Sequence, residues 1–250
     1  MTHKTKGIVL KSIKYGETSL VVTIFTELFG VQTYMVNGVR TSKQSAAKAN
    51  HFQPTVILDL VVYHHEQKSI QRIKEFQFAH LYQHILSDVI KNSIALYQVE
   101  LLYKCLKQPE TNEALFAFCE DAFKMLDTAS NTVAANFPLF FSLQLSYFFG
   151  FRPQQLSQEG TANEVNTGCW FDLKEGYFSN QPPAHAQYIE GELAILTSEL
   201  LKVMHPVELE SFALHHATRR QLLQYYQEYY SLHVQDFGQM KTMKILSEVI

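Results

Sequence analysis

The segment Gly7–Gly30, with the sequence GIVLKSIKYGETSLVVTIFTELFG, decides how the first third of the chain is expected to fold. Two short apolar runs rich in β-branched residues lie on either side of Gly16. Runs of this length and composition, bounded by turn residues, are typical of β-strands. The segment therefore predicts a hairpin whose strands include Ile8–Ile13 and Ser19–Thr26.

Three further runs of the same kind follow before residue 80, at Val31–Val36, Thr55–Tyr63 and Ile70–Phe78. The first of them ends at Asn37-Gly38, a strong turn signal. The polar, alanine-rich stretch Arg40–Asn50 then predicts a loop or a short helix. Five short strands with a longer insertion after the third fit a five-stranded Greek-key barrel of the OB type. Another small barrel, or an antiparallel sheet laid on helices, would give the same pattern.

Beyond residue 80 the apolar residues recur at helical spacing. The spacing predicts helices over 81–106, 110–129, 134–150, 188–204, 207–216 and 218–234, and a short amphipathic element over 239–250. The least regular stretch, 151–187, contains an apolar patch at Cys169–Phe171 and Tyr177-Phe178 that predicts a small hairpin. The predicted fold class is α+β and multidomain, with an OB-type barrel over 1–80 and an all-α helical domain over 81–250 that carries an irregular insert at about 151–187.

The composition is that of a folded intracellular protein. Hydrophobic residues make up 46% of the chain and charged residues 18%, which excludes a mostly disordered chain. The most apolar stretch, Phe137–Phe151, is shorter than a membrane span, and the N-terminus shows no apolar signal core. Three widely separated cysteines fit a reducing compartment. We therefore expect a cytoplasmic protein with no membrane contact.

The charge is distributed unevenly along the chain. Residues 1–80 carry a formal charge of +5, whereas residues 81–250 carry −8. A basic region on an acidic body is compatible with contact to a polyanion at one end of the chain. Solvated charges of no functional importance would give the same numbers.

The sequence contains no recognisable catalytic set. The phosphate-binding, dinucleotide-binding, zinc-protease and nucleophile-elbow motifs are all missing. The pairs His64-His65 and His215-His216 lack further ligands at useful spacing, and Asp59 stands alone in an apolar run, where we expect it to face outward. We predict that the protein is not an enzyme and holds no cofactor.

The best constellation of functional residues lies in the basic barrel region. Lysine and arginine neutralise phosphates, serine hydroxyls bond phosphate oxygens, and tyrosine rings stack on unpaired bases. The alternative is that the lysines only solubilise an exposed sheet edge. The candidate DNA-binding residues are Lys11, Lys14, Tyr15, Tyr34, Arg40, Ser42, Lys43 and Lys48.

The stretch Gly7–Gly30, followed by NGVRTSK at Asn37–Lys43, resembles the beginning of the RecO family of bacterial DNA repair and recombination mediators. The matching positions include Tyr15-Gly16-Glu17, Gly30, and Gly38-x-Arg40 with Ser42-Lys43. The resemblance covers nearly the whole chain, strongly over 1–45 and loosely after 80. There the helical layout agrees, and a C-terminal stretch from Arg219-x-x-Leu222-Leu223 to Lys244-Ile245-Leu246 is similar to the family's end. The resemblance places the family's basic loop on Arg40, Ser42 and Lys43.

The resemblance implies a mediator of homologous recombination in the RecF pathway. RecO-like proteins bind single- and double-stranded DNA through the OB barrel and anneal complementary strands. They engage the acidic C-terminal tail of the single-strand-binding protein SSB, and they work with RecR to load RecA onto SSB-coated DNA. The implied location is the bacterial cytoplasm, at the nucleoid. An alternative is a protein-interaction adaptor that docks SSB and RecR through its acidic helical body and hardly contacts DNA.

The sequence departs from many RecO proteins at the place where they carry a four-cysteine zinc module. Here the stretch 151–187 holds only Cys169. One thiolate does not make a tetrahedral structural site, so we predict no zinc. We expect the aromatic residues Trp170-Phe171 and Tyr177-Phe178 to form a small hydrophobic core in its place.

Overall fold

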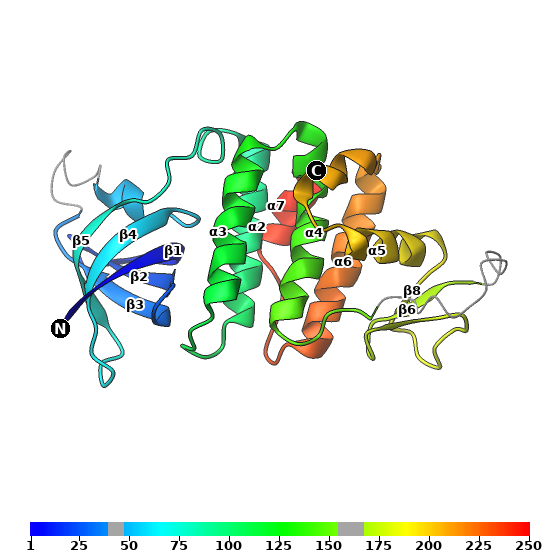
Figure 1. Cartoon of the computed structure of the whole chain (residues 1–250), viewed down its shortest axis with the longest axis horizontal. Helices are drawn as coiled ribbons and strands as arrows, with labels where there is room; N and C mark the ends of the chain where they lie inside the picture. Colours follow the sequence, from blue (N-terminus) through cyan, green and yellow to red (C-terminus); the bar gives the residue numbers. More distant parts are fainter. Residues whose placement is uncertain (40–47, 155–167) are drawn as a thin grey trace. The chain divides into compact units, whose positions relative to one another are not determined.

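The computed structural model describes residues 1–39, 48–154 and 168–250 (Figure 1). Its N-terminal part is a closed barrel with the strand order β1-β2-β3-β5-β4. Neighbouring strands are antiparallel except β3 and β5, which run parallel. The barrel confirms the predicted OB-type fold and excludes an open antiparallel sheet. Its elements are β1 (Thr2–Tyr15), β2 (Ser19–Thr26), β3 (Gly30–Val36), the 3-10 helix η1 (Asn50–Phe52), β4 (Ile57–Tyr63) and β5 (Gln71–Phe78).

Strand alternation fills the barrel with apolar side chains. On β2, Leu20, Val22 and Ile24 belong to the core inside the barrel, so the residues between them point outward. On β1 the pairing shifts: Val9 lies opposite Ile24, but Lys11 lies opposite Thr23. Leu10 is therefore the extra residue of a β-bulge, and beyond it β1 continues with a changed orientation of its side chains.

The remaining chain is largely helical, as predicted. The helices are α2 (Val89–Cys105), α3 (Glu113–Thr128), α4 (Asn131–Phe148), α5 (Glu192–Lys202), the 3-10 helix η2 (Pro206–Ser211), α6 (His216–His233) and α7 (Thr242–Val249). No helix in the described ranges combines the length and the apolar character that crossing a bilayer requires.

The structure corrects three of the predicted helix boundaries. The first helix begins at Val89 rather than near residue 81, because the preceding backbone is held by a side chain of α3 (below). The stretch 207–216 is not an α-helix, since a 3-10 helix begins at Pro206 and ends at Ser211. The stretch 188–204 begins with the short strand β8 (Tyr188–Glu190), and α5 starts only after Gly191, whose φ of 62° breaks the helical path.

Two compact units make up the chain. One comprises Met1–Asp88 and Leu102–Asp127, and the other comprises Val89–Leu101 and Thr128–Ile250. The first unit thus contains the barrel together with α3, and the second contains most of the remaining helices.

In the first unit, α3 packs against the outer face of β1 and β2. The rings of Phe25 and Phe116 lie 5.5 Å apart, and Lys6 Nζ lies 2.9 Å from Glu120 Oε1. Lys124 also binds Glu120 at 2.7 Å. Burial by itself would raise the pKa of Glu120, but hydrogen bonds from Lys124 and Lys6 outweigh it and the pKa is lowered. The outer face of the barrel beside α3 is therefore occupied by packing contacts.

A single carboxylate fixes the chain between the barrel and α2. Asp127, which is 1% exposed, accepts hydrogen bonds of 2.8 Å from the backbone N–H groups of Gln83, His84 and Ile85. Burial alone would raise the pKa of Asp127, but these three bonds favour the charged form and lower it. Tyr82, next to this turn, donates a hydrogen bond to the carbonyl oxygen of Thr55.

The second unit is built around α4, which is buried over most of its length, as its apolar sequence predicts. Ser130 caps α4 by accepting a hydrogen bond from Val133 N, and Pro138 lies in the second turn of the helix. The hydroxyl of Tyr230 on α6 donates to the carbonyl oxygen of Ser142 at 2.7 Å. Figure 1 shows α6 beside α4, in agreement with this bond.

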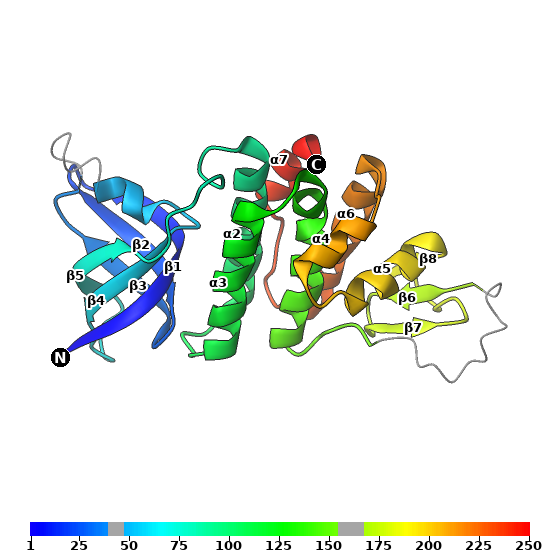
Figure 2. The ribbon, with the colours of Figure 1, turned by 45° about the horizontal axis from the view of Figure 1, so that its top comes forward.

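The irregular insert contains a small three-stranded sheet with the order β7-β6-β8 (Figure 2). Strands β6 (Trp170–Asp172) and β7 (Tyr177–Ser179) form the predicted hairpin, and β8 pairs on the other side of β6. Phe171 and Phe178 are buried and stack at 4.7 Å, and Phe171 also contacts the ring of Tyr229. The small hydrophobic core expected here is thus present, although Tyr177 remains 44% exposed.

The Asp127 contacts lead to a prediction about stability. We expect Asp127→Asn to lower the free energy of unfolding by about 1–3 kcal/mol at neutral pH, because buried N–H donors lose a charged acceptor. Since the folded-state pKa of Asp127 lies below its unfolded value of about 3.9, this contribution is present above that value and disappears as the pH falls through the folded pKa. Urea unfolding at neutral and acidic pH measures it.

The control for this experiment is Asp121→Asn, which removes an exposed carboxylate from the same helix. We expect it to change stability by less than about 0.5 kcal/mol. Equal effects of the two substitutions would contradict the role assigned to Asp127.

Candidate nucleic-acid interface

A continuous row of side chains crosses the outer face of the barrel. Ile13 pairs with Val21, Val21 with Met35, Met35 with Arg72, and Arg72 with Tyr63. We call these five residues the outer row. They point away from the barrel interior because the next residues along β2, β3, β4 and β5 belong to its core or pack against it.

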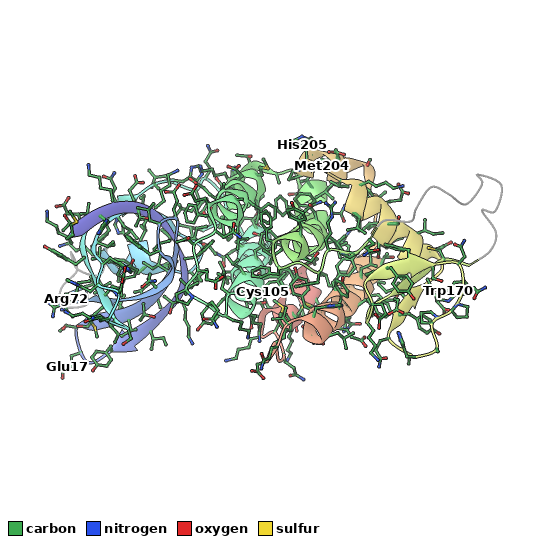
Figure 3. The ribbon with its side chains drawn as sticks, turned by 60° about the horizontal axis from the view of Figure 1, so that its bottom comes forward. Glu17, Arg72, Cys105, Trp170, Met204 and His205 are labelled. Atoms are coloured by element: carbon green, nitrogen blue, oxygen red, sulfur yellow. The ribbon has the colours of Figure 1, made fainter. Side chains whose placement is uncertain are left out.

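The outer row combines apolar, aromatic and cationic groups that solvent can reach. Ile13 is 49% exposed and Tyr63 is 39% exposed, and Arg72 is exposed between β3 and β4. Figure 3 shows the Arg72 side chain at the outer surface of the barrel. Such a surface offers a ring for stacking and a guanidinium for phosphate.

Two of the predicted residues extend this face along β1. Lys11 and Tyr15 lie two residues before and after Ile13, on the same side of the strand. Tyr15 is 60% exposed, and Lys11 Nζ lies 5.7 Å from the centre of the Tyr103 ring. Lys11 is itself exposed, so its cation-π contact leaves the ammonium accessible to phosphate.

Two other predicted lysines lie outside this face. Lys14 is opposite Leu20 and therefore points to the other side of β1, where it is exposed near the end of the strand. Lys48 is exposed just before η1. The structure thus brings Lys11 and Tyr15 together and leaves Lys14 and Lys48 at separate positions on the barrel.

The prediction that Tyr34 stacks on unpaired bases is wrong. Its side chain is 0% exposed and belongs to the core of the barrel, because β3 alternates and turns Met35 outward instead. The Tyr34 hydroxyl has no hydrogen-bond partner among the described residues. Burial raises the pKa of this hydroxyl, which keeps it neutral.

Arg40, Ser42 and Lys43 lie outside the described residues. Their contact with phosphate remains a prediction of the sequence. Gly38, the last glycine before them, has a φ of 70°, as the Asn37-Gly38 turn signal requires.

A hollow adjoins the outer row between β3 and the β4–β5 hairpin. It has a volume of about 650 Å³, and its lining includes Met35, Tyr63, His65, Lys68, Ile70 and Arg72. Sequence reasoning missed these residues. The alternation within Thr55–Tyr63 could have indicated that Tyr63 points outward, but the parallel pairing that brings Met35 beside Arg72 has no local sequence signal.

The outer surface of the barrel also has a groove of different character. A groove across β1, β4 and β5 contains the carboxylates of Glu27, Asp59 and Glu75 together with two lysines. Asp59 faces outward, as expected, and accepts a hydrogen bond from Gln77 Nε2 at 3.3 Å. This mixture of charges is less suited to a polyanion than the outer row.

The insert does not offer a zinc site in the described residues. No group of three or more His, Cys, Asp or Glu side chains with the spacing of metal ligands occurs in 1–39, 48–154 and 168–250. Burial raises the pKa of the Cys169 thiol, which disfavours the thiolate that zinc binds. The oxygens of Asp172 already accept hydrogen bonds from Lys174 N and Glu175 N and lie 3.1 Å from His185 Nε2. The donor set therefore does not fit a structural zinc ion.

An OB-type barrel with an aromatic and cationic outer face, joined to a helical region, defines a class of nucleic-acid-binding proteins. Comparison with known proteins identifies the family. Residues 1–82 match the family model "Recombination protein O N terminal", and residues 86–242 match "Recombination protein O C terminal".

Full-length relatives agree with the family models. The chain is 33% identical over 252 residues to the DNA repair protein RecO of Flavobacterium psychrophilum. It is 31% identical over 250 residues to that of Bacteroides fragilis, and each alignment covers 100% of this chain and 99% of the relative. The chain belongs to the RecO family of recombination and DNA repair proteins.

Removal of the Tyr34 hydroxyl tests whether this side chain is buried away from DNA. We expect Tyr34→Phe to leave the dissociation constant for single-stranded DNA within about twofold, and stability unchanged or raised by up to about 1 kcal/mol, because the hydroxyl lost has no partner. Tyr15→Ala is the matched change on the exposed face and should weaken DNA binding. A large loss of affinity in Tyr34→Phe would place Tyr34 on the DNA surface after all.

The donor set of the insert can be tested by metal analysis. We expect purified protein to contain far less than one equivalent of zinc, and its melting temperature to be unaffected by a chelator, since structural zinc sites contribute folding free energy. Near one equivalent of zinc, removed with a fall in melting temperature, would contradict the donor assignment.

Proposed function

We propose that this protein is a recombination mediator of the RecF pathway that binds single- and double-stranded DNA on the outer face of its barrel. It anneals complementary strands and helps to load RecA onto SSB-coated DNA. Its protein partners in this proposal are RecR and the acidic C-terminal tail of SSB. The observation that supports the proposal is the outer row, in which an arginine and an exposed tyrosine follow an apolar strip from β1 to β4.

The proposed mechanism is physical and involves no covalent step. Positive charge on the barrel lowers the repulsion between two DNA strands and so speeds their encounter. Lys11, Lys14, Lys48 and Arg72, with Arg40, Ser42 and Lys43, supply the phosphate contacts of this proposal. Tyr15 and Tyr63 hold bases by stacking, which tolerates any sequence.

An acidic tail would need a basic site on the helical region. The basic residues there differ in how accessible their charges are. Lys124 is engaged by Glu120, and Lys91 is 6% exposed. In the second unit, Arg152 donates to the carbonyl oxygen of Leu201 and lies 5.9 Å from the ring of Tyr147, which is 61% exposed. An accessible ring beside a guanidinium suits an acidic tail that also carries apolar side chains.

The salt dependence of binding tests the DNA-binding part of the proposal. The affinity for a labelled single-stranded oligonucleotide is measured by fluorescence anisotropy at several salt concentrations. If about three to five phosphates are neutralised, the logarithm of the association constant should fall with the logarithm of the salt concentration, with a slope of roughly −2 to −3.5. The variant Arg40→Ala/Lys43→Ala should show weaker binding and a shallower slope.

The control for this measurement is Lys202→Ala/Lys244→Ala, which removes the same charge from exposed positions on α5 and α7. We expect it to bind as wild type does. Tight binding that neither double variant affects would move the DNA site elsewhere. No binding at low salt would overturn the proposal in favour of an adaptor that docks SSB and RecR.

A further inference from the structure

We propose that the hollow between β3 and the β4–β5 hairpin is a site for one unstacked nucleobase of single-stranded DNA. The proposal rests on the proposed DNA-binding function and assigns part of it to particular residues. These residues were not among those that the sequence pointed to; they come from β3 and from the β4–β5 hairpin with the strand ends beside it.

The lining of the hollow has the chemistry that a nucleotide requires. Tyr63 offers an accessible ring, and Met35 and the 45% exposed Ile70 supply apolar contacts around it. Lys68 and Arg72 add two exposed cations at the same hollow. The phosphates on either side of a base stacked on Tyr63 would therefore lie near the charged groups of Lys68 and Arg72.

The wall of the hollow is held in place before any ligand binds. Gln71, which is 2% exposed, accepts a hydrogen bond from His65 N at 3.0 Å. Its amide nitrogen donates to the carbonyl oxygens of His65 at 2.8 Å and Lys68 at 2.7 Å. Lys68 N also donates to His65 O at 3.0 Å. The hairpin is thus pre-organised, which reduces the entropy lost on binding.

The shape of the site favours single strands over duplex. The hollow is an open surface depression with a volume of about 650 Å³, which is large enough to admit one base. A base can enter such a hollow only when it leaves the helical stack, which costs least in a strand that is already single. Contacts to phosphates alone would not make this distinction.

The experiment separates base contacts from phosphate contacts. Wild type, Tyr63→Ala and Arg72→Gln are each titrated with an oligothymidine and with an oligonucleotide of the same length whose sugars carry no bases. Tyr63→Ala should weaken binding of oligothymidine roughly 5- to 100-fold and leave the abasic strand within about twofold, because stacking needs a base. Arg72→Gln should weaken both and reduce the salt slope by about 0.7.

Two controls accompany these variants. Tyr63→Phe keeps the ring and should bind oligothymidine as wild type does. Lys74→Gln removes a charge from β5 at a residue outside the hollow, where Lys74 forms a salt bridge with Glu75. This variant should change the affinity for either oligonucleotide by no more than about twofold. Both variants alter exposed side chains, so the barrel core is left intact.

The outcomes distinguish the two proposals. Wild-type binding to oligothymidine with no selective effect of Tyr63→Ala would overturn the nucleobase site and leave the DNA-binding barrel in place. Equal losses on both strands in Tyr63→Ala would also overturn it, since they would report a disturbed surface rather than stacking. Failure of wild type to bind either strand would overturn the proposed function itself.

Discussion

The outer face of the barrel depends on a short parallel contact between β3 and β5. Only two pairs define it, Tyr34 with Gln71 and Met35 with Arg72. The first pair faces inward: both side chains are buried, and Gln71 fixes the β4–β5 hairpin. The second pair faces outward and completes the outer row. Closure of the barrel, the position of Arg72 and the wall of the hollow therefore follow from the same contact.

The outer surface of the barrel is divided between a part that packs against α3 and a part that stays exposed to solvent. On one side Lys6 and Phe25 are taken up by α3, and the carboxylate of Glu120 joins two lysines there. On the other side the outer row remains open to solvent. The bulge at Leu10 links the two, because it changes the orientation of β1 between the packed residues before it and the exposed Lys11 after it. One strand thereby serves both surfaces.

Local patterns predicted the elements well, and three-dimensional pairing explains where prediction failed. The strand over Ser19–Thr26 was predicted at its observed limits, and the Phe171–Phe178 hairpin was anticipated from its apolar patch. Tyr34 and Tyr63 are both tyrosines in alternating strands: the alternation within Thr55–Tyr63 could have placed Tyr63 outside, whereas the inward position of Tyr34 became evident only in the assembled barrel. Likewise, no local pattern brings Lys68 of the hairpin next to Met35 of β3, since the two are distant in sequence.

Annealing, as proposed for this protein, requires that a bound strand can still pair, and stacking on the outer row would leave this possible. Stacking uses the face of a base and leaves its Watson–Crick edge open, whereas hydrogen-bond readout would occupy that edge. One base held in the hollow, with its neighbours lying along Met35, Val21 and Ile13, would keep a strand attached while most of its edges stay available. Because only a few phosphates would be contacted, such binding would be weak and reversible, and a finished duplex, whose bases are no longer free to enter the hollow, would be released.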